Sequence, residues 1–383
     1  MPLPVNDVHQ REQLFVSSLP GLEAALADEA RAVLRPAAVR AVTGGVELEG
    51  EPGLHEEANL RLRLASRVLL RLAELPTPPP AQLERTLASV SLARVWDGRT
   101  PLHLSLALSR AFAPAAVLSA AARAWRAPGL SRAGGLDGGE TEEVAAGCTL
   151  LLREAAGRLT LSVDTSGEPL HRRGYRQEVS RAPLRETLAA GVLRLAGYDG
   201  SEPLVDPMCG SGTFLIEAGG MSQGIAPGLS RPFAFESFPQ HVPATWEQRR
   251  ARAKGEALER PRGSLHGFDL NAGALGTARR NARRAGLTLA LERRDVRVLT
   301  PPVPGPGLLV ANPPYGKRVG EAEDLPGLYR ALGATVRGAF AGWRAALLVP
   351  DDPALLQALA LPDSSRVPLR NGGLRCVLLQ TGR

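Results

Sequence analysis

The sequence contains very little cysteine. Its three cysteines, Cys148, Cys209 and Cys376, stand far apart, and no CxxC pair or cluster of histidine with cysteine occurs. This spacing argues against a zinc site, an iron–sulfur cluster and a disulfide framework, so we expect no metal.

Long apolar segments are also missing. No uninterrupted run reaches the ~18 residues that a membrane-spanning helix needs, and no signal peptide precedes His9. We therefore expect a cytoplasmic protein with no membrane partner. Nothing in the sequence decides the oligomeric state, for which a monomer is the expectation. With 383 residues, 44% of them hydrophobic and 22% charged, the chain is long enough for two or three globular domains.

Lysine is scarcer still. Lys254 and Lys317 are the only lysines, so the formal net charge of +7 comes almost entirely from arginine. The guanidinium group is planar and permanently charged, which suits phosphates and base planes and favours a nucleic acid as partner. Coding bias in a GC-rich genome would enrich arginine as well, so the charge alone does not decide the matter.

The clearest functional signal lies in residues 203–218. A short apolar strand ends at Asp206, a turn rich in small residues follows, and a helix-forming segment starts at Thr213. Gly210 and Gly212 have no Cβ and let the backbone approach a ligand, which the N–H groups at the helix start would face. A lone Gly-x-Gly can be an ordinary turn, so the interpretation depends on the later strands.

Three of these later strands end in polar residues, namely Asp269, Asp295 and Asn312. Strands alternate with helices here, as in a parallel sheet, and the carboxyl ends of parallel strands meet at the edge where open α/β sheets bind ligands. Asp269 would accept hydrogen bonds from ribose hydroxyls, and Asp295 with its following amide would meet an adenine edge. Together with Asp206, this order of residues predicts S-adenosylmethionine as the cofactor.

The motif Asn312-Pro313-Pro314-Tyr315 indicates the chemistry. An exocyclic amine of a base is a poor nucleophile, because its lone pair is delocalised into the ring. The Asn312 side-chain oxygen and the Pro313 carbonyl could accept its two N–H groups and direct the lone pair at a sulfonium methyl, while the prolines fix the backbone. Tyr315 would stack on a base that has left its helix. The motif lacks the cysteine of C5-cytosine chemistry, and we expect Cys209 to be a small buried residue.

The N-terminal half shows a different pattern. Short strands and helices alternate over residues 13–72, which predicts an α+β sandwich, and the proline-rich run at 76–80 is expected to be a boundary or a stiff connector. A second unit follows without a catalytic constellation, and its arginines could be a nucleic-acid face or simply a solvated surface. Residues 165–181 carry five basic residues and Tyr175. This linker could contact single-stranded nucleic acid or phosphate, or serve only as a tether.

Several motifs together resemble the THUMP-domain methyltransferases, which form N2-methylguanosine in large-subunit ribosomal RNA or in tRNA. The motifs are DTSGEPLHRRGYR from Asp164, APLRETLAA from Ala182, DPMCGSGTFLIEA from Asp206, IAPGL from Ile225, FAFE from Phe233, GFDLN from Gly267, NPPYG from Asn312 and NGGLRCVLLQ from Asn371. The resemblance spans about residues 10–383, is specific from Asp164 onward and is weaker before it.

The resemblance implies an α/β fold, a Rossmann-like methyltransferase sheet that is parallel except for an antiparallel C-terminal hairpin, preceded by α+β ferredoxin-like and THUMP domains. It implies a ferredoxin-like domain at 1–75, a THUMP RNA-binding domain at 76–165, a basic linker at 166–181 and the methyltransferase domain at 182–383. The cofactor site would comprise Asp206, Cys209, Gly210, Gly212, Thr213, Phe214, Asp269, Leu270, Asp295, Val296 and Asn312. The target-amine site would comprise Asn312, Pro313, Pro314 and Tyr315.

The favoured activity is methylation of the N2 amine of a guanosine in 23S rRNA, with structured RNA as partner. A tRNA substrate is the alternative, and a DNA or RNA N6-adenine methyltransferase is a rival because NPPY serves adenine amines as well. Nothing after Tyr315 is long enough for a separate DNA target-recognition domain. A non-enzymatic RNA-binding protein with a vestigial cofactor fold is the last alternative, and the intact glycine turn, strand-end acids and NPPY argue against it.

Overall fold

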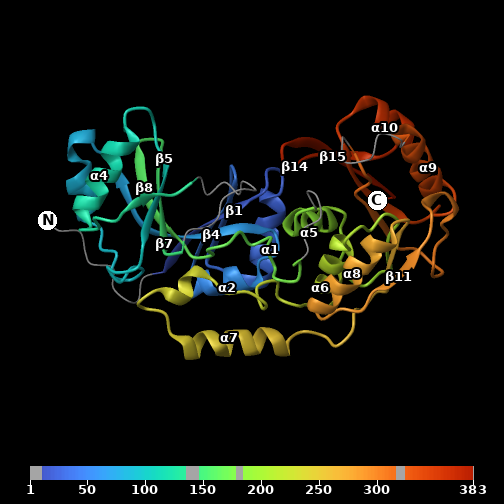
Figure 1. Cartoon of the computed structure of the whole chain (residues 1–383), viewed down its shortest axis with the longest axis horizontal. Coiled ribbons are helices and arrows are strands. Elements are labelled where there is room, and N and C mark those ends of the chain that lie inside the picture. The colour runs from blue at the N-terminus through green and yellow to red at the C-terminus, as the bar shows by residue number, and fades with distance from the viewer. Residues whose placement is uncertain (1–10, 135–145, 178–183, 316–323, 383) are drawn as a thin grey trace. The chain divides into compact units, whose positions relative to one another are not determined.

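The computed structural model describes residues 11–134, 146–177, 184–315 and 324–382. The chain divides into two units (Figure 1). The first consists of Met1–Ser18, Leu26–Leu170 and Arg231–Ala251, and the second of Leu19–Ala25, His171–Ser230 and Arg252–Arg383. Each unit thus includes one short segment whose neighbours in sequence belong to the other unit. These segments are Arg231–Ala251 in the first unit and Leu19–Ala25 in the second.

The first unit is built on an eight-stranded sheet with the strand order β2-β3-β1-β4-β8-β7-β5-β6. The strands are β1 (Glu12–Ser18), β2 (Ala38–Val42), β3 (Gly45–Gly50), β4 (Ala65–Pro76), β5 (Leu102–Ala107), β6 (Ser131–Arg132), β7 (Cys148–Ala155) and β8 (Arg158–Asp164). The helical elements are α1 (Glu23–Leu34), α2 (Leu54–Arg61), η1 (Pro80–Gln82), α3 (Leu83–Ala88), α4 (Pro114–Ala124), η2 (Ala234–Ser237) and α7 (Pro243–Gly255), of which α1 begins and α7 ends in the second unit.

Strand β4 holds the two halves of this sheet together. It pairs with β1 on one side and with β8 on the other. The sequence predicts a break at the proline run 76–80, and β4 does end at Pro76, which lies opposite Arg158 at the end of the ladder, where a residue without an N–H can be accommodated. The predicted α+β parts therefore share one continuous sheet.

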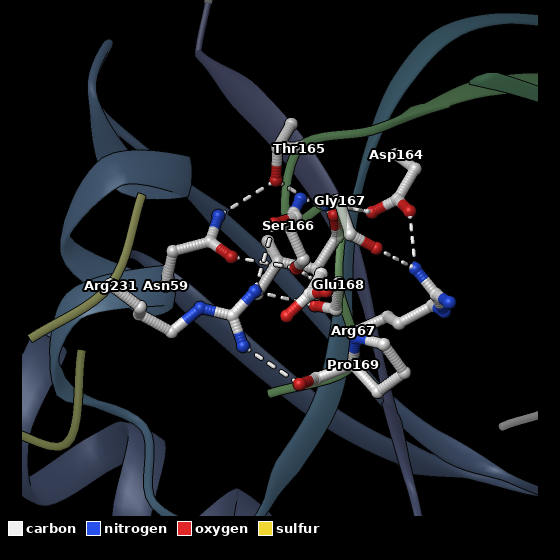
Figure 2. Close-up of polar contacts among 10 residues, drawn as sticks. Asn59, Arg67, Asp164, Thr165, Ser166, Gly167, Glu168, Pro169 and Arg231 are labelled. Atoms are coloured by element: carbon white, nitrogen blue, oxygen red, sulfur yellow. Dashed lines mark hydrogen bonds and ion pairs between the residues drawn. The ribbon is translucent and has the colours of Figure 1, made fainter. Parts of the chain in front are cut away.

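A buried polar network fixes the start of the DTSGEP segment within the first unit (Figure 2). The Asn59 amide donates to the Thr165 hydroxyl at 2.8 Å and its carbonyl accepts from the Ser166 hydroxyl at 2.6 Å. Arg67 forms an ion pair with Asp164 at 2.5 Å. Because buried polar groups are costly unless paired, these reciprocal bonds specify one conformation for the segment.

The segment Arg231–Ala251 is attached to the same network (Figure 2). The guanidinium of Arg231 donates to the carbonyls of Glu168 and Pro169, both at 2.7 Å. Beyond it, Phe235 and Trp246 pack edge to face with ring centroids 5.0 Å apart and are almost fully buried. Aromatic burial and charge-assisted hydrogen bonds therefore bind this segment into the first unit.

The second unit contains a seven-stranded sheet with the order β11-β10-β9-β12-β13-β15-β14. The first five of these pair in parallel, and β15 and β14 are antiparallel, which confirms the predicted Rossmann-like fold. The strands are β9 (Leu204–Asp206), β10 (Leu265–Asp269), β11 (Ala290–Arg293), β12 (Leu308–Ala311), β13 (Arg344–Pro350), β14 (Ser365–Asn371) and β15 (Leu374–Thr381). The helical elements are α5 (Glu186–Leu195), α6 (Thr213–Gln223), α8 (Ala272–Arg284), η3 (Val296–Val298), α9 (Leu325–Arg337) and α10 (Pro353–Leu359).

The central strands of this sheet are buried on both faces. Leu204 of β9 belongs to one apolar cluster together with residues of α5, α6 and α8, whereas its neighbour Val205 belongs to another together with residues of α9 and α10. Successive side chains of a strand point to opposite faces, so uninterrupted apolar runs are what a helix-covered parallel sheet requires.

The segment Leu19–Ala25 contributes to the first of these clusters. Leu22 is completely buried there, and a Cβ built on Gly191 of α5 would lie 2.4 Å from the Leu22 Cδ1 atom. A glycine at this helical position therefore allows Leu22 to pack directly against the backbone of α5.

Candidate active site

The glycine turn after β9 is held by the end of the neighbouring strand. The Asp269 carboxylate accepts the Gly210 N–H at 2.9 Å and the Asn271 N–H at 2.8 Å, and the Cys209 N–H donates to the Phe268 carbonyl at 2.9 Å. Asp269 thus fixes two backbone segments at the carboxyl edge of the sheet. The sequence predicts a ribose contact for this residue, and the structure adds a role in shaping the turn.

The two glycines of the turn have positive φ angles, +52° at Gly210 and +82° at Gly212. A Cβ on Gly210 would meet no atom within 4 Å, whereas one on Gly212 would lie 3.1 Å from the Ala278 Cβ. Gly210 therefore borders open space at the start of α6, as a ligand-binding turn requires, and Gly212 serves helix packing as well. Asn281 of α8 supports the turn by donating to the Ser211 carbonyl at 3.2 Å.

Asp206 is a buried carboxyl group with few partners. It is 2% exposed, and its Oδ1 atom accepts the Met208 N–H at 3.1 Å. Burial raises the pKa of Asp206 to about 8, and the nearby charge of Asp269 acts in the same direction. A carboxylate in this environment is best stabilised by a cationic ligand.

Two other predicted cofactor residues lie in the core. Cys209 is 6% exposed, which confirms that it is a small buried residue, and burial raises the pKa of its thiol above the usual range, which disfavours the thiolate form. Phe214 is 2% exposed and belongs to the cluster beneath α6. The side chain of Phe214 therefore anchors the start of α6 in the core. Thr213 is the first residue of this helix.

The predicted adenine end of the site combines an exposed and a buried apolar residue. Leu270 is 52% exposed directly after Asp269, so its side chain can cover a flat ring. Val296 is 4% exposed, and a ligand would therefore meet its backbone. Asp295 caps η3 by accepting the Arg297 N–H at 2.9 Å and also pairs with the Arg297 guanidinium at 3.0 Å.

The NPPY segment follows β12 at the same edge of the sheet. The Asn312 Oδ1 atom is buried, and it accepts no hydrogen bond from any residue that the structure describes. The Pro314 carbonyl accepts the Tyr329 hydroxyl at 3.4 Å, and the Tyr315 hydroxyl accepts the Asn371 amide. A buried acceptor without a donor is costly, so the geometry favours a ligand that supplies an N–H group to Asn312.

The described part of the linker supports the cofactor turn. Arg176 donates to the Thr213 hydroxyl at 2.6 Å, and Tyr175 is 6% exposed with its hydroxyl 3.4 Å from Glu217 of α6. The possible role of Tyr175 in binding single strands is therefore not supported by its burial. Because these linker residues pack against the helix that follows the glycine turn, the linker does more than tether the two parts of the chain, which was the alternative role.

Sequence reasoning missed Arg176, Asn281, Tyr329 and Asn371. Arg176 and Asn371 lie in motifs that carry the resemblance, so their side chains could have been considered, whereas Asn281 and Tyr329 lie in helices without any distinguishing pattern. The four predicted strand ends do come together, because β11, β10, β9 and β12 are neighbours in the sheet.

Other features of the described chain lie elsewhere. A cavity of about 600 Å³ is lined by residues 301–306, 339 and 341–343. These segments precede β12 and β13, so the cavity lies at the amino edge of the sheet, opposite the candidate site. Within the described ranges, no group of three or more histidine, cysteine, aspartate or glutamate residues could hold a metal ion. In the same ranges no helix combines the length and apolarity needed to cross a membrane.

Known proteins match this chain over nearly its whole length. It is 35% identical to ribosomal RNA large subunit methyltransferase K/L of Chromohalobacter salexigens over 400 aligned residues, which cover 98% of this chain and 53% of that protein. The namesake from Syntrophotalea carbinolica is also 35% identical, with 96% and 53% covered. The chain thus spans about half the length of the curated relatives it matches.

Solved structures agree with the fold. A protein from Listeria monocytogenes, described as a predicted N6-adenine-specific DNA methylase, superposes with a TM-score of 0.83 at 26% identity, covering 97% of this chain and 96% of that one. The methyltransferase SMU.472, solved in complex with SAH, gives 0.81 at 25% identity, with 97% and 98% covered.

Two family models match the sequence. The model for an RlmL ferredoxin-like domain matches residues 13–69. The model described as RMKL-like, methyltransferase domain matches residues 173–380, which is more than half of the chain and includes the glycine turn, the strand-end acids and the NPPY segment. The chain therefore belongs to the RMKL-like methyltransferase family.

Proposed function

We propose that this protein transfers a methyl group from S-adenosylmethionine to the exocyclic N2 amine of a guanosine in 23S ribosomal RNA. The buried Asn312 Oδ1 atom, which no described donor satisfies, is the observation that carries the proposal. It lies at the carboxyl edge of the sheet together with the glycine turn, where a base amine and the cofactor could meet.

The residues of the edge fit S-adenosylmethionine. When bound, it supplies an electrophilic methyl group on a positively charged sulfur, and it also carries an ammonium group. Asp206 offers a buried carboxylate that needs a cation, Gly210 borders open space, and Leu270 presents an exposed apolar side chain. The SAH bound to SMU.472 supports the same assignment here.

The chain's own part in the reaction is positioning and polarisation. Asn312 Oδ1 and the Pro313 carbonyl would accept the two N–H groups of the amine, which localises its lone pair and fixes its direction. The Pro314 carbonyl is already engaged by Tyr329, so Pro313 is the better second acceptor. Preorganised dipoles in a water-excluded site contribute more than the same dipoles in water, and no covalent enzyme intermediate is needed.

The ribosomal substrate is supported by the names of the curated relatives. This chain is 35% identical to them over about half of their length. An excess of arginine and a ferredoxin-like N-terminal match suit a structured RNA. We further propose the domain boundaries predicted above, with a THUMP RNA-binding domain at 76–165, and a monomer acting in the cytoplasm. A tRNA substrate is the alternative, and the description of the Listeria protein keeps adenine N6 as a rival.

The test is transfer of a labelled methyl group from S-adenosylmethionine to total rRNA, total tRNA and duplex DNA, followed by nucleoside analysis. N2-methylguanosine in large-subunit rRNA is the expected product. The same product in tRNA alone would change the substrate, and N6-methyladenine in any of the three would refute the guanine assignment while leaving the cofactor unchanged.

A further inference from the structure

The C-terminal hairpin brings a polar residue to the edge of the candidate active site. Asn371 ends β14, and two glycines lead to Leu374, the first residue of β15. Strand β15 is antiparallel to β13, with Cys376 opposite Pro350 at the carboxyl end of β13. The turn of the hairpin therefore lies at the same edge as the end of β12, from which the NPPY segment leaves the sheet.

Asn371 hydrogen-bonds to the NPPY segment across this edge. Its side-chain amide donates to the Tyr315 hydroxyl, and the two residues are 9% and 4% exposed. In the sheet, β13 and β15 stand between β12 and β14. Neighbouring strands are about 4.8 Å apart, so the segment after β12 reaches across roughly 14 Å of sheet edge to make this contact.

The segment between these two anchors is stiff. Pro313 and Pro314 have fixed φ angles, and the Pro314 carbonyl is held by the Tyr329 hydroxyl at 3.4 Å. Asn312 is attached to β12 at one end and Tyr315 is bonded to Asn371 at the other. A change at the Tyr315 end is therefore transmitted through the prolines to the Asn312 side chain.

We propose that Asn371 is a positioning residue for the target amine, because its bond to Tyr315 holds the NPPY segment so that Asn312 Oδ1 meets the amine. The inference rests on the proposed amine methylation and adds a residue to it. Asn371 does not touch the reacting atoms. Asp206 and Asp269, two of the residues predicted to hold the cofactor, lie on β9 and β10, which are separated from β14 by other strands, so we expect loss of Asn371 to change cofactor binding little.

A purely structural hydrogen bond predicts a different result. Removing such a bond lowers the folding stability slightly and leaves the folded fraction fully active. A positioning bond instead affects turnover, since a displacement of about 1 Å in an active site can lower the rate roughly a hundredfold. The proposal is therefore decided by kcat measured on folded protein.

The experiment compares Asn371→Leu, which is close in volume and cannot donate, with Tyr315→Phe, which removes only the hydroxyl. Both are expected to lower kcat on RNA by roughly tenfold to a hundredfold, with KM for RNA and Kd for SAH changed less than about twofold. The double variant should be no slower than the single ones, because both remove the same bond. Gly373→Ala is the matched control, since its methyl group would meet no atom within 4 Å.

A second readout needs neither cofactor nor RNA. The sequence has four tyrosines, so tyrosine labelled with carbon-13 at the phenol carbon gives a spectrum that can be assigned with Tyr315→Phe. Asn371→Leu should shift the signals of Tyr315 and of Tyr329, whose hydroxyl bonds to the Pro314 carbonyl, and leave those of Tyr175 and Tyr198 in place, which also shows that the variant is folded. If Asn371→Leu does not fold, Tyr315→Phe carries the kinetic test alone.

Three outcomes would overturn the inference. Unchanged kcat in Tyr315→Phe, or in folded Asn371→Leu, with an active wild type would refute it while leaving the proposed function standing. Additive losses in the double variant would show that Asn371 acts by another route. A wild type that binds SAH but methylates no RNA or DNA would refute the proposed function and this inference with it.

Discussion

The buried Asp206 should make cofactor binding depend on pH. Burial raises the pKa of this carboxyl from 3.8 to about 8 in the free protein. S-adenosylmethionine and SAH both carry an ammonium group, and a cation is best bound by the ionised carboxylate. Below pH 8, binding must therefore be coupled to the loss of a proton from Asp206.

The magnitude follows from linkage. When a ligand binds only the ionised form, its affinity rises up to roughly tenfold per pH unit below the pKa, so SAH should bind about 25-fold tighter at pH 7.5 than at pH 6. The stability of the free protein should show the opposite trend. Because the folded pKa is raised, the folded state binds the proton more tightly, and stability falls as pH rises from about 4 to 8. Full ionisation costs roughly 5–6 kcal/mol at most.

The assay is calorimetric titration with SAH between pH 6 and 7.5 in two buffers of different ionisation enthalpy, which also counts the protons released. Asp206→Asn is the matched variant, because it keeps the shape of the side chain and the acceptor for the Met208 N–H. It should bind SAH more weakly at pH 7.5, with affinity independent of pH in this range, and it should resist urea better than the wild type at that pH. A flat wild-type profile, or an equal slope in the variant, would refute the assignment of Asp206.

Four further predictions concern other parts of the chain. Asn312→Ala should leave the Kd for SAH nearly unchanged and remove most of the methyl transfer, and equal loss of both would make the residue structural. Asp269→Ala should weaken SAH binding by roughly tenfold or more in calorimetry, since it removes the ribose contact and also frees the Gly210 N–H of the turn and the Asn271 N–H after β10. Gly191→Ala, although it improves helix propensity, should lower stability by about 1–3 kcal/mol in urea unfolding, because its Cβ would collide with Leu22; a stabilised variant would contradict this packing. A fragment without residues 1–165 should aggregate or lose thermal stability, and one as soluble and stable as the full chain would contradict the two-unit description.

The fold of the methyltransferase domain can be predicted well from the sequence, because the patterns that indicate its strands and strand ends are local. Buried apolar strands such as Leu308–Ala311 read as continuous runs, and polar residues at their ends are forced to one edge by the parallel topology. The positions of Asp206, Asp269, Asp295 and Asn312 at the carboxyl ends of four neighbouring strands follow from this rule. No knowledge of side-chain packing is needed for it.

Contacts between distant segments could not be predicted in this way. The hydrogen bond between Asn371 and Tyr315 joins residues 56 positions apart, and Asn371 reads from sequence only as a turn former. Similarly, the proline run predicts a boundary between two parts, and β4 does end at Pro76, but its pairing with β8 joins the parts before and after the run into one sheet. Both depend on tertiary pairing, which overrides local propensity.

The insertion between β9 and β10 shows how the chain's order in sequence differs from its order in space. Its Arg231 satisfies the carbonyls of Glu168 and Pro169, so the segment that follows is part of the first unit's polar network. Leu22, from the N-terminal stretch, is likewise part of the second unit's core. A cut between the two halves of the sequence would therefore remove an apolar residue from one core and expose the buried aromatic rings of Phe235 and Trp246 from the other. Point variants at Asn59 or Arg67, which weaken the network without removing either segment, are thus a better means than truncation of asking what the first unit contributes to the proposed RNA methylation.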